Sequence, residues 1–390
     1  MKFPANQAGR DWHFQDLMLH RVHEILLVAS PYDAFILEED GRLTAQILHE
    51  YLGMNLSYAP RVWQANTAAY AMDLLSRRSI DLIIVMLRIS DMDPVTFGTK
   101  VKELYKNKPI ILLAFDESEV KQLPENIDEV IDNVFVWTGD SNVFPAIIKC
   151  IEDTKNVKRD IRKGNVRAIL FIEDTPWYYS SILPVIYKET LYHTKQLIDK
   201  SLNDTQRLLH MRGRPKILLA KSYEVAEKYF KQYKNNILGI ISDIRFPKNE
   251  KLHPNAGILF AKYVRSIEST MPILLQSNEK EALELARTIT PNVLNKSSST
   301  LFSELREFII YNFGFGDFVF KLPNGEEIGK AVNMEELVEF ISTIPKESLD
   351  YHGSSNHFSN WLAARGEFKL ATQFRMVKKT DFNNLDERRQ

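Results

Sequence analysis

The sequence predicts an α/β protein with two doubly wound parallel sheets, followed by a small α+β segment. Two observations support this prediction. Short, continuous apolar runs recur along the chain, separated by stretches of helix length, which is typical of parallel strands buried on both faces. This succession occurs twice before the pattern changes near Tyr311. At 390 residues, the chain is long enough for two or three domains.

The first domain is expected over residues 1–155. Apolar runs at residues 23–30 (HEILLVAS), 81–87 (DLIIVML) and 108–115 (KPIILLAF) predict buried strands. The amphipathic stretch TAAYAMDLLSRRS supplies one of the connecting helices. The charged residues 150–165 then lead into the second domain.

The second domain is expected over residues 166–312 and repeats the same order. Its predicted strands are VRAILFIED, KILLA, ILGIISD and MPILLQS, with a short fifth strand in PNVLN. The helix predicted from Tyr178 to Leu209 is unusually long. We expect it to offer a surface for a partner.

The last segment, residues 313–390, does not repeat the pattern. Asn324 and Gly325 stand between two short strand-like runs, which predicts a hairpin. Asn333 followed by Glu336 has the spacing of a helix N-cap with a reciprocating glutamate. A further amphipathic helix is predicted within residues 357–374, with an apolar face that includes Trp361 next to Arg365.

Composition excludes several classes of protein. The formal charge of −1 argues against a dedicated nucleic-acid surface. No apolar run reaches the roughly 20 residues of a membrane span, and the first residues lack a signal-peptide pattern. We therefore expect a cytoplasmic protein that binds neither membrane nor nucleic acid. The single cysteine, Cys150, rules out an internal disulfide and is expected to be buried.

Polar side chains gather at the predicted strand ends of the second domain. Functional groups of doubly wound sheets collect at the carboxyl ends of the strands. Three carboxylates, one hydroxyl and one ammonium group are expected to meet there, from Glu173, Asp174, Asp243, Ser277 and Lys296. Clustered carboxylates form a hard-oxygen site suited to Mg²⁺.

These strand ends resemble the receiver domain of bacterial two-component response regulators. The motifs ILFIEDTP, SDIRFP, PILLQS and VLNKS match those of the family in order. The resemblance implies a flavodoxin-like fold in which Asp243 accepts a phosphoryl group from a histidine kinase or a small phosphodonor. It also implies that Lys296 and Ser277 bind the phosphoryl oxygens. Mg²⁺ would be held by the carboxylates of Glu173, Asp174 and Asp243 and by the carbonyl of Arg245.

Several residues depart from the receiver pattern. The position before Lys296 that often carries a switching aromatic residue is Val293, and Ser297 replaces the usual proline after the lysine. Asn278 stands where the family usually has a small residue, and we expect it to restrict access. A haloacid-dehalogenase-like phosphatase also uses a strand-end aspartate, but it needs a second aspartate where this chain has Arg245.

The first domain resembles a receiver that has lost its chemistry. Ala29 and Ser30 occupy the place of the acidic pair, and Met86 that of the acceptor. Ala114 replaces the hydroxyl residue, and Trp137 replaces the lysine. We interpret this domain as a pseudo-receiver that serves for docking or for forming a homodimer. The nearby Asp33 and Asp91 are expected in surface turns.

The leading hypothesis is a phosphorelay protein rather than a self-contained enzyme. The last segment weakly resembles the connector of phosphoenolpyruvate-synthase-like proteins, over residues 314–389. One alternative is therefore the regulatory part of a larger phosphotransferase, with its catalytic region beyond Gln390. On either reading, the segment would couple the receiver to a protein partner or to that region. A second alternative is a non-catalytic scaffold. His352 and His357 are expected as loop or cap residues, because no further ligand completes a metal site.

Overall fold

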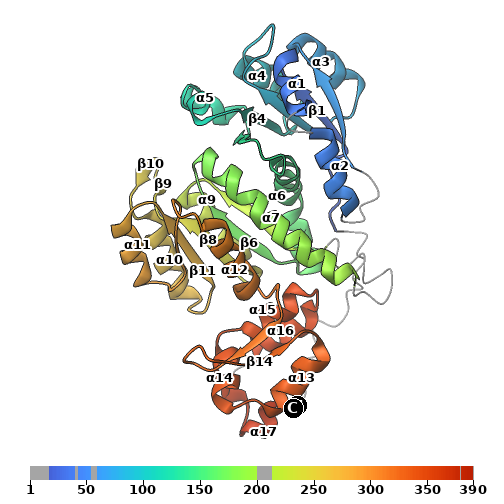
Figure 1. Cartoon of the computed structure of the whole chain (residues 1–390). Coiled ribbons are helices and arrows are strands. Elements are labelled where there is room, and N and C mark those ends of the chain that lie inside the picture. The colour runs from blue at the N-terminus through green and yellow to red at the C-terminus, as the bar shows by residue number, and fades with distance from the viewer. Residues whose placement is uncertain (1–16, 40–42, 54–58, 200–212, 378, 390) are drawn as a thin grey trace.

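The computed structural model describes the chain except for residues 1–16, 40–42, 54–58, 200–212, 378 and 390. Figure 1 shows the first domain, the second domain and the C-terminal segment following one another from one end of the molecule to the other. The described part contains two parallel five-stranded sheets and two small antiparallel hairpins. No described helix is both long and apolar enough to cross a membrane.

The first sheet has the strand order β2-β1-β3-β4-β5, and every neighbouring pair is parallel. This is the flavodoxin-like, doubly wound order. The predicted strands are present, but β2 and β5 were not predicted. The edge strand β2 is half exposed, and β5 has only four residues, so neither forms a long apolar run. The strands are β1 Glu24–Val28, β2 Arg61–Ala65, β3 Leu82–Met86, β4 Ile110–Ala114 and β5 Asn133–Val136. The helices are α1 Pro31–Glu39, α2 Leu43–Gly53, α3 Ala68–Arg77, α4 Pro94–Leu104, α5 Glu117–Lys121, the 3-10 helix η2 Glu125–Glu129 and α6 Val143–Gly164.

The second sheet, ordered β12-β11-β8-β6-β7, repeats the topology of the first. Read in chain order, its strands also follow the 2-1-3-4-5 arrangement, and all its pairs are parallel. The strands are β6 Ala168–Ile172, β7 Lys216–Ala220, β8 Ile237–Asp243, β11 Ile273–Ser277 and β12 Val293–Asn295. The helices are α7 Pro176–Asp199, α9 Tyr223–Tyr233, α10 Ala256–Ile267, α11 Lys280–Arg287 and α12 Leu301–Asn312. The predicted long helix is described only as far as Asp199, because residues 200–212 lie outside the described part.

A short hairpin follows β8 and was not predicted. Its strands are β9 Phe246–Lys248 and β10 Lys251–His253, joined by Asn249 and Glu250 at positive φ. Three residues a strand are too few for an alternating pattern to be visible in the sequence.

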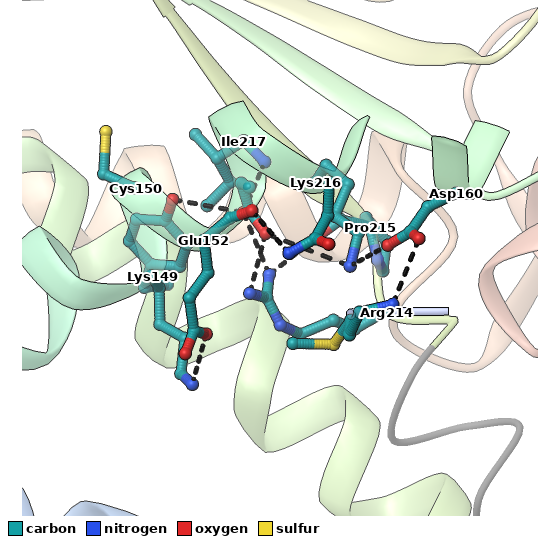
Figure 2. Close-up of polar contacts among 12 residues, drawn as sticks. Lys149, Cys150, Glu152, Asp160, Arg214, Pro215, Lys216 and Ile217 are labelled. Carbon is teal, nitrogen blue, oxygen red and sulfur yellow. Dashed lines mark hydrogen bonds and ion pairs between the residues drawn. The ribbon is translucent and has the colours of Figure 1, made fainter. Parts of the chain in front are cut away.

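Helix α6 continues past residue 155, the expected end of the first domain, and contacts both domains. Toward the second domain, Asp153 forms a bidentate ion pair with Arg214 at 2.7 and 3.0 Å and accepts the Ile217 N–H. Lys216 lies 3.1 Å from Asp160 (Figure 2). These charged side chains are fully buried, so each depends on its partner.

A polar stripe on α6 also fixes the segment that precedes β1. Side-chain oxygens of Glu152, Asn156 and Asp160 accept the backbone N–H groups of Val22, His20 and Met18. The acceptors are spaced four residues apart on the helix, and the donors are every second residue of the segment before β1. One face of α6 therefore accepts alternate backbone N–H groups of this segment.

Helix α7, the first helix of the second domain, covers the edge of the first sheet. The Ser180 hydroxyl accepts the Val136 N–H at 2.9 Å, and the Tyr179 hydroxyl donates to the Val134 carbonyl. The Tyr179 ring also packs edge-on against Phe135. These contacts satisfy backbone groups that an open edge strand would leave unpaired.

The C-terminal segment consists of a hairpin and short helices. The predicted turn is present, with Gly325 at φ 90° between β13 and β14, and Asn333 accepts the Glu336 N–H as the predicted cap. The helix predicted over residues 357–374 is interrupted, because α15 ends before Gly366, which has φ 80°. The elements are β13 Phe318–Lys321, β14 Glu327–Ala331, α13 Met334–Thr343, α14 Lys346–Ser354, α15 His357–Ala364, α16 Phe368–Met376, the 3-10 helix η3 Lys379–Asp381 and α17 Leu385–Arg389.

Candidate functional site

Three carboxylates converge at the carboxyl edge of the second sheet. Glu173 and Asp174 follow β6, and Asp243 ends the neighbouring strand β8. One oxygen from each lies within 4.8 Å of the others. We call these residues the acid cluster. Among the described residues, it is the one group of three or more potential metal ligands at this spacing.

Lys296 joins two members of the acid cluster. It follows β12, and its Nζ lies 2.6 Å from Glu173 Oε2 and 2.9 Å from Asp243 Oδ2. The Lys296 side chain is only 3% exposed, so both ion pairs are shielded from solvent. Burial alone would lower the pKa of Lys296, but the two carboxylates outweigh it and raise that pKa above its usual value.

Burial raises the pKa of every carboxyl group in the acid cluster. The pKa of Glu173 rises to about 8, chiefly through burial and further through Asp243, although Lys296 opposes the rise. The pKa of Asp174 rises to about 6, through burial and then the charge of Asp243. The pKa of Asp243 is also raised, with burial the largest cause. Ionising the whole cluster is therefore unfavourable without a further cation, and an added cation would stabilise the ionised form.

The acid cluster fits a hard divalent cation such as Mg²⁺. The Oδ1 atom of Asp174 is buried and has no hydrogen-bond partner, so its lone pairs are available to a metal ion. Carboxylate oxygens are the ligands that Mg²⁺ prefers. The side chain of Arg245 points away to an exposed ion pair with Glu279, at 3.2 Å. Metal ligation by the Arg245 carbonyl stays a prediction.

The backbone around Asp243 is tightly packed. Asp243 Oδ1 accepts the Ile244 N–H at 2.7 Å, which orients the carboxylate. A Cβ atom added to Gly257 would lie 2.1 Å from the Asp243 carbonyl oxygen. Helix α10 can therefore approach the end of β8 only with glycine at that position.

Ser277 lies beside Asp243, at the end of the adjacent strand β11. Its Oγ accepts the Glu279 N–H at 3.1 Å, which leaves the hydroxyl hydrogen available as a donor. The preceding residue, Gln276, is fully buried and donates from Nε2 to Glu173 Oε2 at 3.3 Å. Sequence reasoning missed Gln276, because a single polar residue inside an apolar run gives no periodic signal.

Sequence reasoning also missed a polar bridge across the site. Tyr178, in the first turn of α7, accepts a hydrogen bond from Asn278 Nδ2 at 2.6 Å. Asn278 Oδ1 in turn accepts one from Ser297 Oγ at 2.8 Å. The Lys296 Nζ lies 4.1 Å from the centroid of the Tyr178 ring. Asn278 and Ser297, which departed from the receiver pattern, thus interact with each other.

The corresponding edge of the first sheet carries no such cluster among the described residues. Apolar side chains are buried where the acceptor, the hydroxyl and the lysine would stand, namely Met86, Ala114 and Trp137. The surface-turn prediction for Asp33 is wrong, because Asp33 lies in the first turn of α1, is 1% exposed and makes no side-chain hydrogen bond. Asp91 does lie in an exposed turn and accepts the N–H groups that begin α3.

The two C-terminal histidines form a hydrogen-bonded pair. Lys321 N donates to His352 Nε2 at 2.7 Å, so the proton of His352 is on Nδ1 and is donated to His357 Nδ1 at 2.9 Å. Burial lowers the pKa of His352 to about 3 and that of His357 to about 4. Both rings are therefore neutral at pH 7. The prediction of loop or cap residues is wrong for both histidines. His357 is the first residue of α15, after the N-cap Asn356, and His352 is buried in the last turn of α14.

Comparison with known proteins gives structural similarity at low identity. No family model matches the chain, and no curated protein matches it significantly. A signal receiver domain of an HD domain-containing protein from Pseudomonas fluorescens Pf-5 is 23% identical, over 36% of this chain and 93% of its own, with a TM-score of 0.26. The chemotaxis response regulator CheY4 of Vibrio cholerae is 16% identical, over 33% of this chain and 98% of its own, with a TM-score of 0.27. NtrX from Brucella abortus is 11% identical, over 95% of this chain and its full length, with a TM-score of 0.29. The fold assignment rests on the strand order of the two sheets rather than on these scores.

Proposed function

We propose that the second domain is a receiver that accepts a phosphoryl group on Asp243 in a phosphorelay. The observation that supports this most directly is the bridge of Lys296 between Glu173 and Asp243, at the carboxyl edge of a doubly wound sheet. A buried ammonium group placed against a carboxylate also lies where it can bind a phosphoryl group attached to that carboxylate.

The proposed reaction is a direct transfer. An Asp243 carboxylate oxygen attacks the phosphorus of the donor, the bond from phosphorus to the leaving group breaks, and the leaving group departs with the electron pair. The donor is a phosphohistidine of a kinase or a small molecule such as acetyl phosphate. Lys296 binds phosphoryl oxygens as a point charge, and the free hydroxyl hydrogen of Ser277 is available to donate to them.

Mg²⁺ would be held by the acid cluster, with the Arg245 carbonyl as the further ligand implied by the receiver pattern. When bound, the ion neutralises charge on the transferring phosphoryl group and on the carboxylates. When Asp174 is ionised, its Oδ1 atom, which has no hydrogen-bond partner, is available to bind the ion. The first domain, without carboxylates at the matching positions, takes no phosphoryl group and serves as a docking domain.

Intact-mass measurement tests this function. The full chain is incubated with Mg²⁺ and acetyl phosphate, or with phosphoramidate, and is expected to gain the mass of one phosphoryl group. Asp243→Asn keeps the side-chain size and should abolish the gain. Asp91→Asn, at the corresponding edge of the first sheet, is the matched control and should label like wild type. Absence of label on the folded wild-type chain with both donors would refute the proposal.

A further inference from the structure

Tyr178 supplies a part of the site that does not come from a strand end. It lies four residues after Asp174, in the first turn of α7. Its ring faces the Lys296 ammonium, with 4.1 Å between Nζ and the ring centroid. Its hydroxyl is hydrogen-bonded to Asn278 in the loop that follows β11.

The Lys296 ammonium is thus held between an aromatic face and two carboxylates. A cation–π contact is worth most where the cation is shielded from water, and the Lys296 side chain is 3% exposed. The ring attracts the ammonium electrostatically through its π face. The oxygen contacts of the ammonium are those with Glu173 and Asp243, at 2.6 and 2.9 Å.

We propose that Tyr178 is the positioning residue of Lys296: its ring holds the ammonium against Asp243 and therefore against a phosphoryl group on that residue. This inference rests on the proposed function of Asp243. The ring positions the ammonium, whereas the hydroxyl links the segments that follow β11 and β12 through Asn278 and Ser297. The two roles can be separated by substitution.

The variants follow from this division. Tyr178→Phe keeps the aromatic face and removes the bond to Asn278, whereas Tyr178→Leu removes the face as well. Trp177→Leu is the matched control, because Trp177 is the neighbouring aromatic residue on the same helix and its side chain is 38% exposed. Lys296→Gln, alone and combined with Tyr178→Leu, completes a double-mutant cycle.

The readout is the initial rate of phosphoryl incorporation, measured by intact mass at varied acetyl phosphate and Mg²⁺. We expect Tyr178→Phe and Trp177→Leu to stay within about twofold of wild type, and Tyr178→Leu to lower the maximal rate about fivefold, as expected for a shielded cation–π contact. Tyr178 reaches the site through Lys296 and Asn278, so the Mg²⁺ concentration for half-maximal rate should not change.

The cycle distinguishes positioning from a general loss of structure. If Tyr178 acts through Lys296, Tyr178→Leu should slow the Lys296→Gln variant no further. An equal slowing in both backgrounds, or an equal loss in the Phe and Leu variants, would overturn the inference while leaving the function of Asp243 in place. Failure of the folded wild-type chain to label would instead remove the proposed function, and this inference with it.

Discussion

Glu173 and Asp174 retain their protons to an unusually high pH, because folding buries them beside Asp243. Their pKa values, about 8 and about 6, exceed those of the same groups in an unfolded chain. Between the unfolded and folded pKa values, the native state binds more protons than the unfolded state. The metal-free fold therefore loses stability as the pH rises from about 4 toward 8.

Mg²⁺ binding should follow the opposite trend. The ion needs ionised carboxylates, so binding releases protons, and affinity should rise with pH. We expect calorimetry to give an affinity about tenfold lower at pH 6.5 than at pH 8.5, with proton release that is visible on changing the buffer. Asp174→Asn removes one candidate ligand and should weaken binding at both values. An equal affinity of the wild-type chain at the two pH values would contradict the raised pKa values.

The sequence predicted the positions of some site residues but not the contacts of others. Asp243 and Lys296 could be located because they directly follow apolar runs, and parallel strands bring their ends to one edge. The contact of Tyr178 with Lys296 could not, because it depends on how α7 is rotated about its axis. The buried position of Asp33 was missed for the same reason.

Helix α6 carries buried charges that solvent cannot stabilise. The Asp153 and Arg214 side chains are 0% and 2% exposed, and Lys216 is fully buried beside them. Asp153→Ala would remove a carboxylate from beside the buried cations Arg214 and Lys216. Removing one partner of a buried ion pair typically lowers the free energy of unfolding by about 3 to 5 kcal/mol. The exposed pair of Asp73 and Arg77 provides the matched control.

Urea denaturation measures this difference. Asp73→Ala should change the free energy of unfolding by less than about 1 kcal/mol, because exposed ion pairs contribute little. Asp153→Ala should lower it several times more. Equal effects of the two substitutions would show that the buried network does not stabilise the junction between the domains.

The sequence predicted the buried strands well and the helix boundaries less well. The continuous apolar runs gave β3, β4, β6 and β8, since both faces of these strands are covered. The end of α6 at Gly164 agrees with the sequence, but the burial of its acidic residues was missed, because in sequence they are indistinguishable from solvated charges. Only the tertiary partners, from the chain before β1 and from β7, show that they are buried.

The C-terminal segment lies at the amino ends of the strands of the second sheet, whereas the acid cluster lies at their carboxyl ends. Thr372, Asn356 and Arg375 hydrogen-bond to Asn165, Thr270 and the Asn235 carbonyl, which precede β6, β11 and β8. Helix α7 connects the two edges (Figure 1). It contacts the site through Tyr178, the first sheet through Tyr179 and the C-terminal segment through the bond from His193 Nε2 to the Ala364 carbonyl.

This arrangement gives the predicted coupling a physical route. If phosphorylation of Asp243 changes the position of Lys296 against the Tyr178 ring, the change can reach residues 313–376 along α7. Binding of Mg²⁺ and beryllofluoride, a phosphoryl mimic, should then alter the protection of backbone amides in α7 and around Ala364, which hydrogen exchange measures. Asp243→Asn should show no change. Identical protection of residues 313–376 in a wild-type chain that binds the mimic would leave this segment as passive structure.

We propose that one of the two similar domains accepts a phosphoryl group, at Asp243. The most direct test is to phosphorylate the full chain with acetyl phosphate and Mg²⁺, trap the acyl phosphate by borohydride reduction, and locate the modified residue by peptide mass spectrometry. We expect modification on the peptide that contains Asp243 and none on peptides from the first domain. Modification at another residue, or an unmodified Asp243 in a chain that has gained phosphoryl mass, would contradict it.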